Sequence, residues 1–220
     1  KNINSKYYKF IFSGLGFNSN QVKKINIFFA LKGNKLNGNK YVSDAINRGA
    51  KIIVSDENLK INKKDIIFIK HNKPRKLLAE ISYKLLIKKP KNLVAVTGTN
   101  GKSSVSDFYY QILNLNNKRS ASIGTVGIQF DNKNKTIDKT TLDPITLSKV
   151  INYLSKRKIN NMILEASSHG LKQNRLDGLF FDIGIFTNLS HDHLDYHKNL
   201  KDYLNSKLYL FQNLIKKKGC

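Results

Sequence analysis

The sequence predicts the α/β fold class, because short apolar runs alternate with segments of helical periodicity along its whole length. The apolar runs show no alternation with polar residues, which is typical of parallel strands covered on both faces. A basic segment broken by Pro90, residues 88–92, separates two such series. We therefore expect a Rossmann-like α/β domain over residues 1–88 and a second, truncated, P-loop-type α/β domain with a parallel sheet over residues 89–220.

The first domain is predicted from five segments. Strands are expected at residues 26–33, 51–56 and 65–70, and helices at residues 39–50 and 73–89. The first helix ends at a Gly-Ala stop, and the second has Pro74 near its start, where a missing N–H costs nothing.

The second domain repeats the alternation with longer helices. Strands are expected at residues 92–98, 161–167 and 181–188, and helices at residues 102–115, 144–158 and 200–217. The strand 92–98 ends directly at a glycine-rich turn, so we expect a functional site at this end of the strand.

Composition and charge limit which partners and which cellular compartment we expect for this protein. The 220 residues carry a net charge of +24, but the lysines are spread along the whole chain, without aromatic interleaving or zinc-finger spacing. We therefore expect no specific nucleic acid partner. No apolar run reaches the roughly 20 residues that span a bilayer, and the lone Cys220 suits a reducing compartment. A cytoplasmic monomer with no membrane contact is expected.

Residues 94–105, VAVTGTNGKSSV, predict a phosphate cradle between a strand and a helix. Gly98 and Gly101 let backbone N–H groups turn inward, and the helix N-terminus adds partial positive charge. Lys102 can reach phosphates, and the Ser103 hydroxyl can bind Mg²⁺. The general P-loop has four residues between its glycines, and this loop has two, so it is a variant; the alternative is a plain glycine-rich turn. The expected nucleotide contacts are Gly98, Thr99, Asn100, Gly101, Lys102, Ser103 and Ser104.

This cradle and three longer segments resemble the Mur ligase family. The motif G-T-N-G-K-S-S resembles its ATP site, which folylpolyglutamate synthetases share. Residues 164–176 resemble the E-x-S-S-H-G-L-x-Q-x-R segment of the MurE branch, the UDP-N-acetylmuramoyl-tripeptide synthetases. Residues 186–197 resemble that branch's T-N-L-x-x-D-H-L-D-Y-H segment, and residues 28–50 its uridine-nucleotide domain.

The resemblance implies an ATP-dependent carboxylate–amine ligase of peptidoglycan biosynthesis. ATP would phosphorylate the D-glutamate carboxylate of UDP-MurNAc-L-Ala-D-Glu, and an amine of a diamino acid, meso-diaminopimelate or L-lysine, would displace phosphate. Mg²⁺ and cationic side chains would offset the repulsion between the two anions.

The resemblance also implies site residues. Lys102, His193 and Lys207 are expected to be catalytic, and Ser103, Glu165, His193 and Lys207 to bind Mg²⁺. Lys207 is expected as a carbamate, because an ammonium would repel Mg²⁺ whereas the CO₂ adduct is an anionic oxygen donor. The expected substrate contacts are Phe17, Ser19, Asn34, Thr140, Thr141, Ser167, Gln173 and Arg175.

The chain departs from the family's pattern mainly near the uridine nucleotide. Asn18-Ser19-Asn20 stands where the family usually has Asp-Ser-Arg, so a cation is lost, and Lys32 or Lys35 is a candidate replacement. We expect the family's C-terminal domain to be missing from this chain. We therefore expect a fragment that turns over little substrate by itself. The alternatives are another Mur-type or folylpolyglutamate-type ligase, or an inactive nucleotide-binding remnant.

Overall fold

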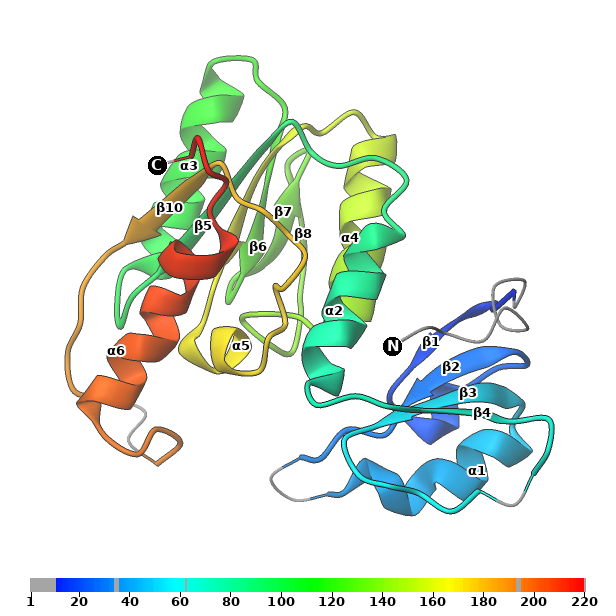
Figure 1. The fold of residues 1–220 in the computed structure, drawn as a ribbon. Helices are drawn as coiled ribbons and strands as arrows, with labels where there is room; N and C mark the ends of the chain where they lie inside the picture. Colours follow the sequence, from blue (N-terminus) through cyan, green and yellow to red (C-terminus); the bar gives the residue numbers. More distant parts are fainter. Residues whose placement is uncertain (1–10, 34–35, 62, 193–194, 220) are drawn as a thin grey trace. The chain divides into compact units, whose positions relative to one another are not determined.

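The fold is taken from a computed structural model that describes residues 11–33, 36–61, 63–192 and 195–219. The chain divides into two compact units between Leu78 and Ala79 (Figure 1). The division falls inside helix α2 (Pro74–Lys84), and the domain boundary expected at residues 88–92 stays a prediction.

The first unit is a four-stranded parallel sheet in the order β1-β2-β3-β4. Its strands are β1 (Gly14–Gly16), β2 (Asn26–Phe29), β3 (Ala50–Ser55) and β4 (Ile67–Lys70). Its helices are the 3₁₀ turns η2 (Ser19–Gln21) and η3 (Gly38–Tyr41) and helix α1 (Val42–Asn47). The predicted helix 39–50 is therefore shorter, because Gly49 adopts a φ of 105° and the chain turns into β3.

The second unit contains a six-stranded sheet in the order β10-β5-β9-β6-β7-β8. Its strands are β5 (Asn92–Thr97), β6 (Ser120–Gly124), β7 (Gly127–Phe130), β8 (Lys133–Lys135), β9 (Asn161–Glu165) and β10 (Ile183–Phe186). The prediction of a parallel sheet is confirmed for β10, β5, β9 and β6. Strands β6, β7 and β8 were not predicted, and β7 pairs antiparallel with both β6 and β8. A two-residue turn with positive φ at Asp131 and Asn132 joins β7 and β8, as in type I′ hairpins.

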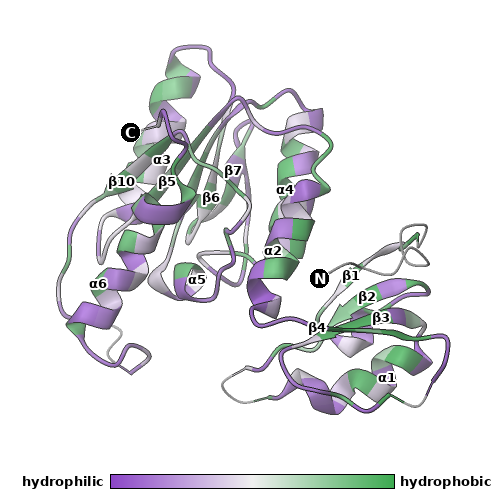
Figure 2. Ribbon diagram, in the orientation of Figure 1, coloured by the Kyte–Doolittle hydropathy of each residue, from purple (hydrophilic) through white to green (hydrophobic). Residues whose placement is uncertain are grey.

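Helices cover both faces of this sheet, as two hydrophobic clusters demonstrate. Alternate residues of β5 point to opposite sides: Val94 and Val96 pack with helix α3, whereas Ala95 lies in the larger cluster with α2 and α4. The central strands are accordingly apolar (Figure 2). The helices are α3 (Lys102–Leu115), α4 (Pro144–Lys156), α5 (Ser168–Lys172) and α6 (Leu200–Tyr209), the last continued by the π turn η4 (Leu210–Leu214).

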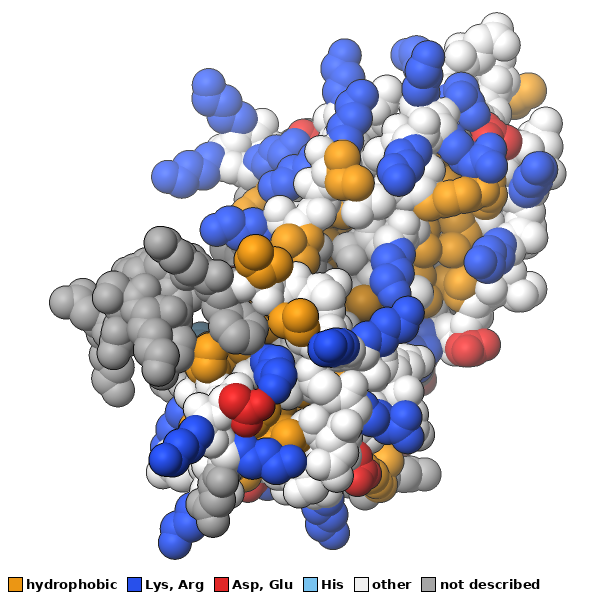
Figure 3. All heavy atoms as spheres, turned by 90° about the vertical axis from the view of Figure 1, so that its right-hand side faces the viewer, with side chains coloured by type: hydrophobic (Ala, Val, Ile, Leu, Met, Phe, Trp, Pro, Cys, Tyr) orange, Lys and Arg blue, Asp and Glu red, His pale blue; other side chains and the backbone are white. Residues whose placement is uncertain are grey.

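The surface matches the even spread of lysine in the sequence. In the face drawn in Figure 3, Lys and Arg side chains are scattered rather than gathered in one stripe. Within the described part of the chain, no helix is long and apolar enough to cross a bilayer.

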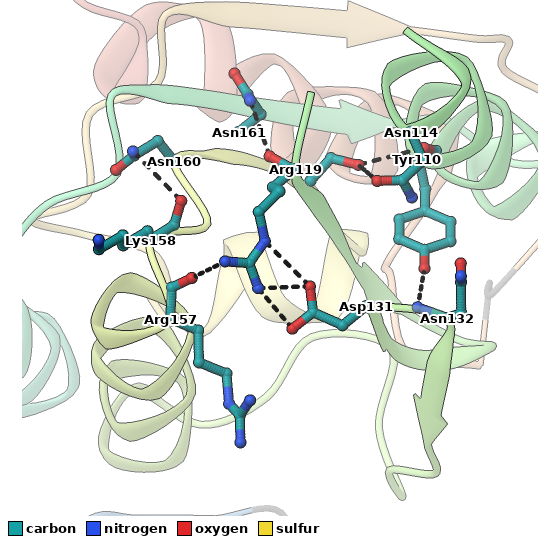
Figure 4. A network of polar contacts seen from close by, with 10 residues as sticks. Tyr110, Asn114, Arg119, Asp131, Asn132, Arg157, Lys158, Asn160 and Asn161 are labelled. Carbon is teal, nitrogen blue, oxygen red and sulfur yellow. Dashed lines mark hydrogen bonds and ion pairs between the residues drawn. The ribbon is translucent and has the colours of Figure 1, made fainter. Parts of the chain in front are cut away.

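Arg119, directly before β6, is the centre of a hydrogen-bond network at the amino-terminal end of that strand (Figure 4). Its guanidinium donates to both carboxylate oxygens of Asp131 at 2.7 and 2.8 Å, and to the backbone oxygen of Arg157 at 2.6 Å. The network thus links β6 to the β7–β8 turn and to the end of α4.

Replacing Arg119 by Ala is expected to destabilise the second unit by about 1–2 kcal/mol. The bidentate carboxylate pair and the carbonyl contact are both lost, although partial exposure weakens the ionic part. Chemical denaturation at low and high salt measures this. Arg48→Ala, a change in the first unit, serves as the control. A stability loss that vanishes in high salt would show that the carbonyl contact contributes nothing.

Candidate active site

The glycine-rich loop lies between the carboxyl end of β5 and the start of α3. Gly98 has a φ of 150° and Gly101 a φ of 82°, conformations that L side chains rarely adopt. A Cβ at Gly98 would lie 1.8 Å from Thr187 Oγ1 and 3.1 Å from the Asn188 backbone nitrogen. Gly98 is therefore required both by its backbone conformation and by the close approach of the loop after β10.

Thr187 and Asn188 anchor this loop. The Thr99 and Asn100 N–H groups donate to the Asn188 backbone and side-chain oxygens at 2.9 and 3.0 Å. The Thr187 hydroxyl donates to the Asn100 backbone oxygen at 2.6 Å. This Thr-Asn pair belongs to the motif at residues 186–197, but its role in holding the phosphate cradle in shape was not predicted from the sequence.

The start of α3 presents backbone donors. The helix's hydrogen bonds begin with the Val105 N–H group, which donates to the Gly101 carbonyl at 3.0 Å. The N–H groups of Lys102, Ser103 and Ser104 come before it and so have no partner within the helix. Such a helix start favours a bound anion, and phosphate is well suited to it.

Lys102 is folded over the loop from which it projects. Its Nζ donates to the Gly98 and Thr99 carbonyls at 2.9 and 2.8 Å. Burial lowers the pKa of the Lys102 ammonium, and the nearby charges of Glu165 and Asp192 oppose that shift. The side chain can exchange these carbonyls for a phosphate oxygen without leaving the loop.

Lys207 is almost fully buried in α6, with 1% of its surface exposed. Its Nζ donates to the Gly98 carbonyl at 2.6 Å and lies 4.1 Å from the centre of the Tyr203 ring. Burial first, and then the neighbouring Lys102 charge, lowers the pKa of Lys207 to about 7. A substantial fraction of neutral amine therefore exists near neutral pH, which distinguishes this lysine from solvated ones.

Glu165 ends β9 as a buried carboxylate held by three donors. These are the Ser103 hydroxyl at 3.2 Å, and the backbone N–H and hydroxyl of Thr125, each at 3.0 Å. A Cβ at Gly124 would lie 2.1 Å from Glu165 Oε1, so the glycine makes room for the carboxylate. Thr125 was not among the predicted site residues.

The oxygen donors beside the cradle fit Mg²⁺. Ser103 and Glu165 lie within hydrogen-bond distance of each other and supply a hydroxyl and a carboxylate, both hard ligands. Among the described residues, no group of three or more His, Cys, Asp or Glu side chains could hold a metal by itself. Mg²⁺ usually binds one or two carboxylates together with substrate phosphates and water, so the set is adequate. The predicted ligand His193 lies outside the described residues.

The residues expected to contact the peptide part of the substrate adjoin Glu165. The Thr141 hydroxyl donates to the Glu165 backbone oxygen at 2.8 Å and accepts from the Ser167 N–H at 2.9 Å. Arg175 donates to the Thr141 backbone oxygen at 2.5 Å and to the side-chain oxygen of Gln173 at 2.7 Å. The structure therefore brings these four residues together.

A cavity of about 310 Å³ extends from the cradle to two of the expected substrate contacts, Thr140 and Ser167. Its lining consists of Gly98, Thr99, Asn100, Gly101, Lys102, Ser103, Ser104, Thr125, Thr140, Ser167, Ser168, Tyr203 and Lys207. Sequence reasoning missed three of them, Thr125, Ser168 and Tyr203. Thr125 lies between two glycines in the segment G-T-V-G, a turn signal that could have drawn attention to it.

A buried histidine supports the wall of the cavity. His197 has 1% of its surface exposed, and its Nε2 lies 3.0 Å from the Ser168 hydroxyl. Its Nδ1 lies 3.5 Å from the Ser206 hydroxyl and 3.7 Å from the Asp202 carboxylate. The ring thus connects α5 with α6, the helix that carries Lys207.

In the first unit, the expected nucleotide contacts lie in the loop after β1. Ser19 is buried within η2, and Phe17 is half-buried just before it. The Arg48 guanidinium lies 3.5 Å from the Asn20 side-chain oxygen, so a cation is present beside the residue where the family usually has arginine. The predicted contact Asn34, and Lys35, lie outside the described residues.

Two family models match this chain, each over a different part of it. Residues 11–84 match a family described as "Mur ligase family, catalytic domain". Residues 96–219, more than half of the chain, match the "Mur ligase middle domain". The chain belongs to the Mur ligase family. Membership implies the use of ATP, in keeping with a phosphate cradle at the start of α3.

Two curated relatives at 40% identity share one name. The chain is 40% identical, over 99% of its length, to the UDP-N-acetylmuramoyl-L-alanyl-D-glutamate–2,6-diaminopimelate ligase of Rickettsia montanensis. It is also 40% identical, over 93% of its length, to the ligase of the same name from Mesorhizobium japonicum. The predicted resemblance to the MurE branch is confirmed. The chain spans 46% and 42% of these relatives' lengths.

Solved structures agree with the fold. A diaminopimelate ligase of the same name superposes with a TM-score of 0.86 at 30% identity, covering 98% of this chain and 44% of that one. The MurF ligase of Thermotoga maritima superposes with a TM-score of 0.58 at 19% identity, which shows a shared fold alone.

Proposed function

We propose that this chain is the nucleotide- and substrate-binding part of a ligase that adds a diamino acid to UDP-MurNAc-L-Ala-D-Glu, with ATP as co-substrate, in peptidoglycan biosynthesis. The observation that carries the proposal is the single cavity that Lys102, Ser103 and Lys207 share with Thr140 and Ser167. Two of the expected substrate contacts, Thr140 and Ser167, thus line the same space as the loop proposed to bind phosphates. The similarity to 2,6-diaminopimelate ligases favours meso-diaminopimelate as the amine.

The residues of this cavity suit the approach of two anions. The start of α3 and Lys102 would hold the β- and γ-phosphates of ATP, so that their charge is offset by fixed donors. Thr140, Ser167 and Arg175 would place the D-glutamate carboxylate, with Arg175 giving up a present contact to pair with it. Mg²⁺, held by Ser103 and Glu165, would offset negative charge on the transferring phosphoryl group.

We propose that Lys207 acts as a carbamate in the working enzyme. Its buried amine lies in the same cavity as Ser103, where a negative oxygen donor would assist a bound cation. A carbamate keeps one N–H group, so its contact with the Gly98 carbonyl can persist. The uridine nucleotide would be held by the first unit, through Phe17, Ser19 and the loop at Asn34. His193 would complete the metal site.

The proposal is tested by separating nucleotide binding from uridine-substrate binding. Lys102→Ala is expected to weaken ATP binding at least 100-fold, because it removes the cation at the phosphates. Isothermal titration with ATP and Mg²⁺, and separately with UDP-MurNAc-L-Ala-D-Glu, measures both. The second affinity should stay within twofold of that of the unchanged chain.

Two controls complete this test. Lys149→Ala, a substitution outside the cavity lining on α4, should leave both affinities unchanged. Formation of the tripeptide product is measured on the whole protein, with meso-diaminopimelate and L-lysine offered separately. Failure of the chain to bind either ATP or the uridine substrate would refute the proposal.

A further inference from the structure

Thr125 occupies the tip of the tight turn between β6 and β7. Gly124 and Gly127 pair directly across the two strands, so Thr125 and Val126 form a two-residue connection. The turn places Thr125 in the lining of the cavity, between Glu165 of β9 and Thr140. None of the expected roles of the site includes this residue.

The direction of the hydrogen bonds around Thr125 follows from its single hydroxyl proton. An ionised carboxylate only accepts hydrogen bonds, so the Thr125 hydroxyl donates to Glu165 Oε2 at 3.0 Å. The Thr140 hydroxyl lies 3.0 Å from the Thr125 hydroxyl and must then be the donor of that contact. The order is therefore Thr140 to Thr125 to Glu165, and the Thr140 oxygen keeps its lone pairs for a ligand N–H.

The turn also holds the carboxylate from a second side. The Thr125 N–H group donates to Glu165 Oε1 at 3.0 Å, so one residue contacts both carboxylate oxygens. Ser103, the third donor, would bind Mg²⁺ through an oxygen lone pair, and its O–H could still donate to Glu165. The two donors of Thr125 would hold both carboxylate oxygens without themselves binding the metal.

We propose that Thr125 is a positioning residue, which fixes the Glu165 carboxylate for nucleotide-bound Mg²⁺ and leaves the Thr140 oxygen as an acceptor for substrate. The inference rests on the proposed magnesium role of Glu165 and deepens it. Hydrogen bonds to a metal-binding carboxylate orient it before the metal arrives, which reduces the free-energy cost of ordering the site.

The first test uses Thr125→Val, which keeps the shape and the backbone N–H but removes the hydroxyl, and Thr125→Ser, which restores it. The 220-residue chain is titrated with Mg²⁺ at a fixed concentration of the ATP analogue AMP-PNP, and binding is followed by calorimetry. Thr125→Val should raise the Mg²⁺ midpoint about tenfold, while the affinity for AMP-PNP in EDTA stays unchanged. Thr125→Ser should return the midpoint to within twofold of the unchanged chain.

Two outcomes of this titration overturn the inference. One is an unchanged Mg²⁺ midpoint in Thr125→Val. The other is an equal loss of affinity with Mg²⁺ and with EDTA, which would mean that the substitution only disturbs the cavity.

A second test needs no nucleotide. The denaturation midpoints of Thr125→Val, Glu165→Ala and the double variant form a cycle that isolates the contact between the two side chains. Thr125→Val should lower the denaturation midpoint when Glu165 is present. It should have little effect on the midpoint in a chain that already carries Glu165→Ala. Additive shifts would overturn the inference. A chain that binds no nucleotide but shows the coupling would instead contradict the proposed function.

Discussion

Replacing Gly98 by Ala is expected to abolish nucleotide binding and to destabilise the second unit by about 3 kcal/mol. The new Cβ would lie 1.8 Å from Thr187 Oγ1 and 3.1 Å from the Asn188 backbone nitrogen, so the loop after β10 would have to move. Alanine at a φ of 150° adds backbone strain. Because Thr187 and Asn188 hold the cradle in shape, their displacement would also misplace its donors. Chemical denaturation and calorimetric titration with ATP measure the two effects.

Gly101→Ala is the matched control for this substitution. Gly101 also has a positive φ, of 82°, but the nearest atoms to its new Cβ would lie 3.8 Å away, at ordinary contact distance. Only backbone strain remains, which is worth about 1–2 kcal/mol. Equal losses of stability in the two variants would show that the close approach at Gly98 has no energetic consequence.

Replacing Lys207 by Met is expected to stabilise the chain by about 4 kcal/mol at pH 7 in CO₂-free buffer. The pKa of Lys207 is lowered to about 7 in the folded chain, chiefly by burial and then by Lys102, whereas an unfolded lysine titrates near 10.4. Between these values the unfolded chain binds more protons, so this lysine makes stability rise with pH. Methionine has a similar shape and no charge, and the Gly98 carbonyl keeps its contact with Lys102.

The pH dependence gives the sharper measurement. Between pH 6.5 and 9.5, the unfolding free energy of the unchanged chain should rise toward that of Lys207→Met, and the difference should fall to about 1 kcal/mol. Lys201→Met, an exposed position on the same helix, should leave the slope unchanged. Parallel pH profiles of the unchanged chain and Lys207→Met would show that Lys207 titrates like a solvated lysine. Added bicarbonate should then stabilise only chains with Lys207, if the carbamate forms.

Local signals in the sequence were sufficient for the main elements and for the phosphate cradle. Helix α3 has the predicted bounds, 102–115. A glycine-rich turn marks its start, and the helical periodicity of apolar residues extends to its end. Strands β5 and β9 were also predicted, since burial on both faces makes their central residues apolar. By contrast, β6 was missed because Ser120-Ala121-Ser122 gives no strand signal, although contacts with β7 and β9 bury it.

Residue types and their spacing were enough to predict which residues could do chemistry: a cradle of two glycines, a lysine and serines, and the motif residues Glu165 and Lys207. The charge and the contacts of these residues depend on the folded chain. Thr125 is 40 positions away from Glu165 in sequence, yet it contacts both carboxylate oxygens. Lys207 looks like any other helix lysine until burial beside Lys102 changes its pKa. Periodicity and turn residues are local properties that a sequence displays, whereas burial, charge and hydrogen-bond partners depend on distant segments that meet only in the folded chain.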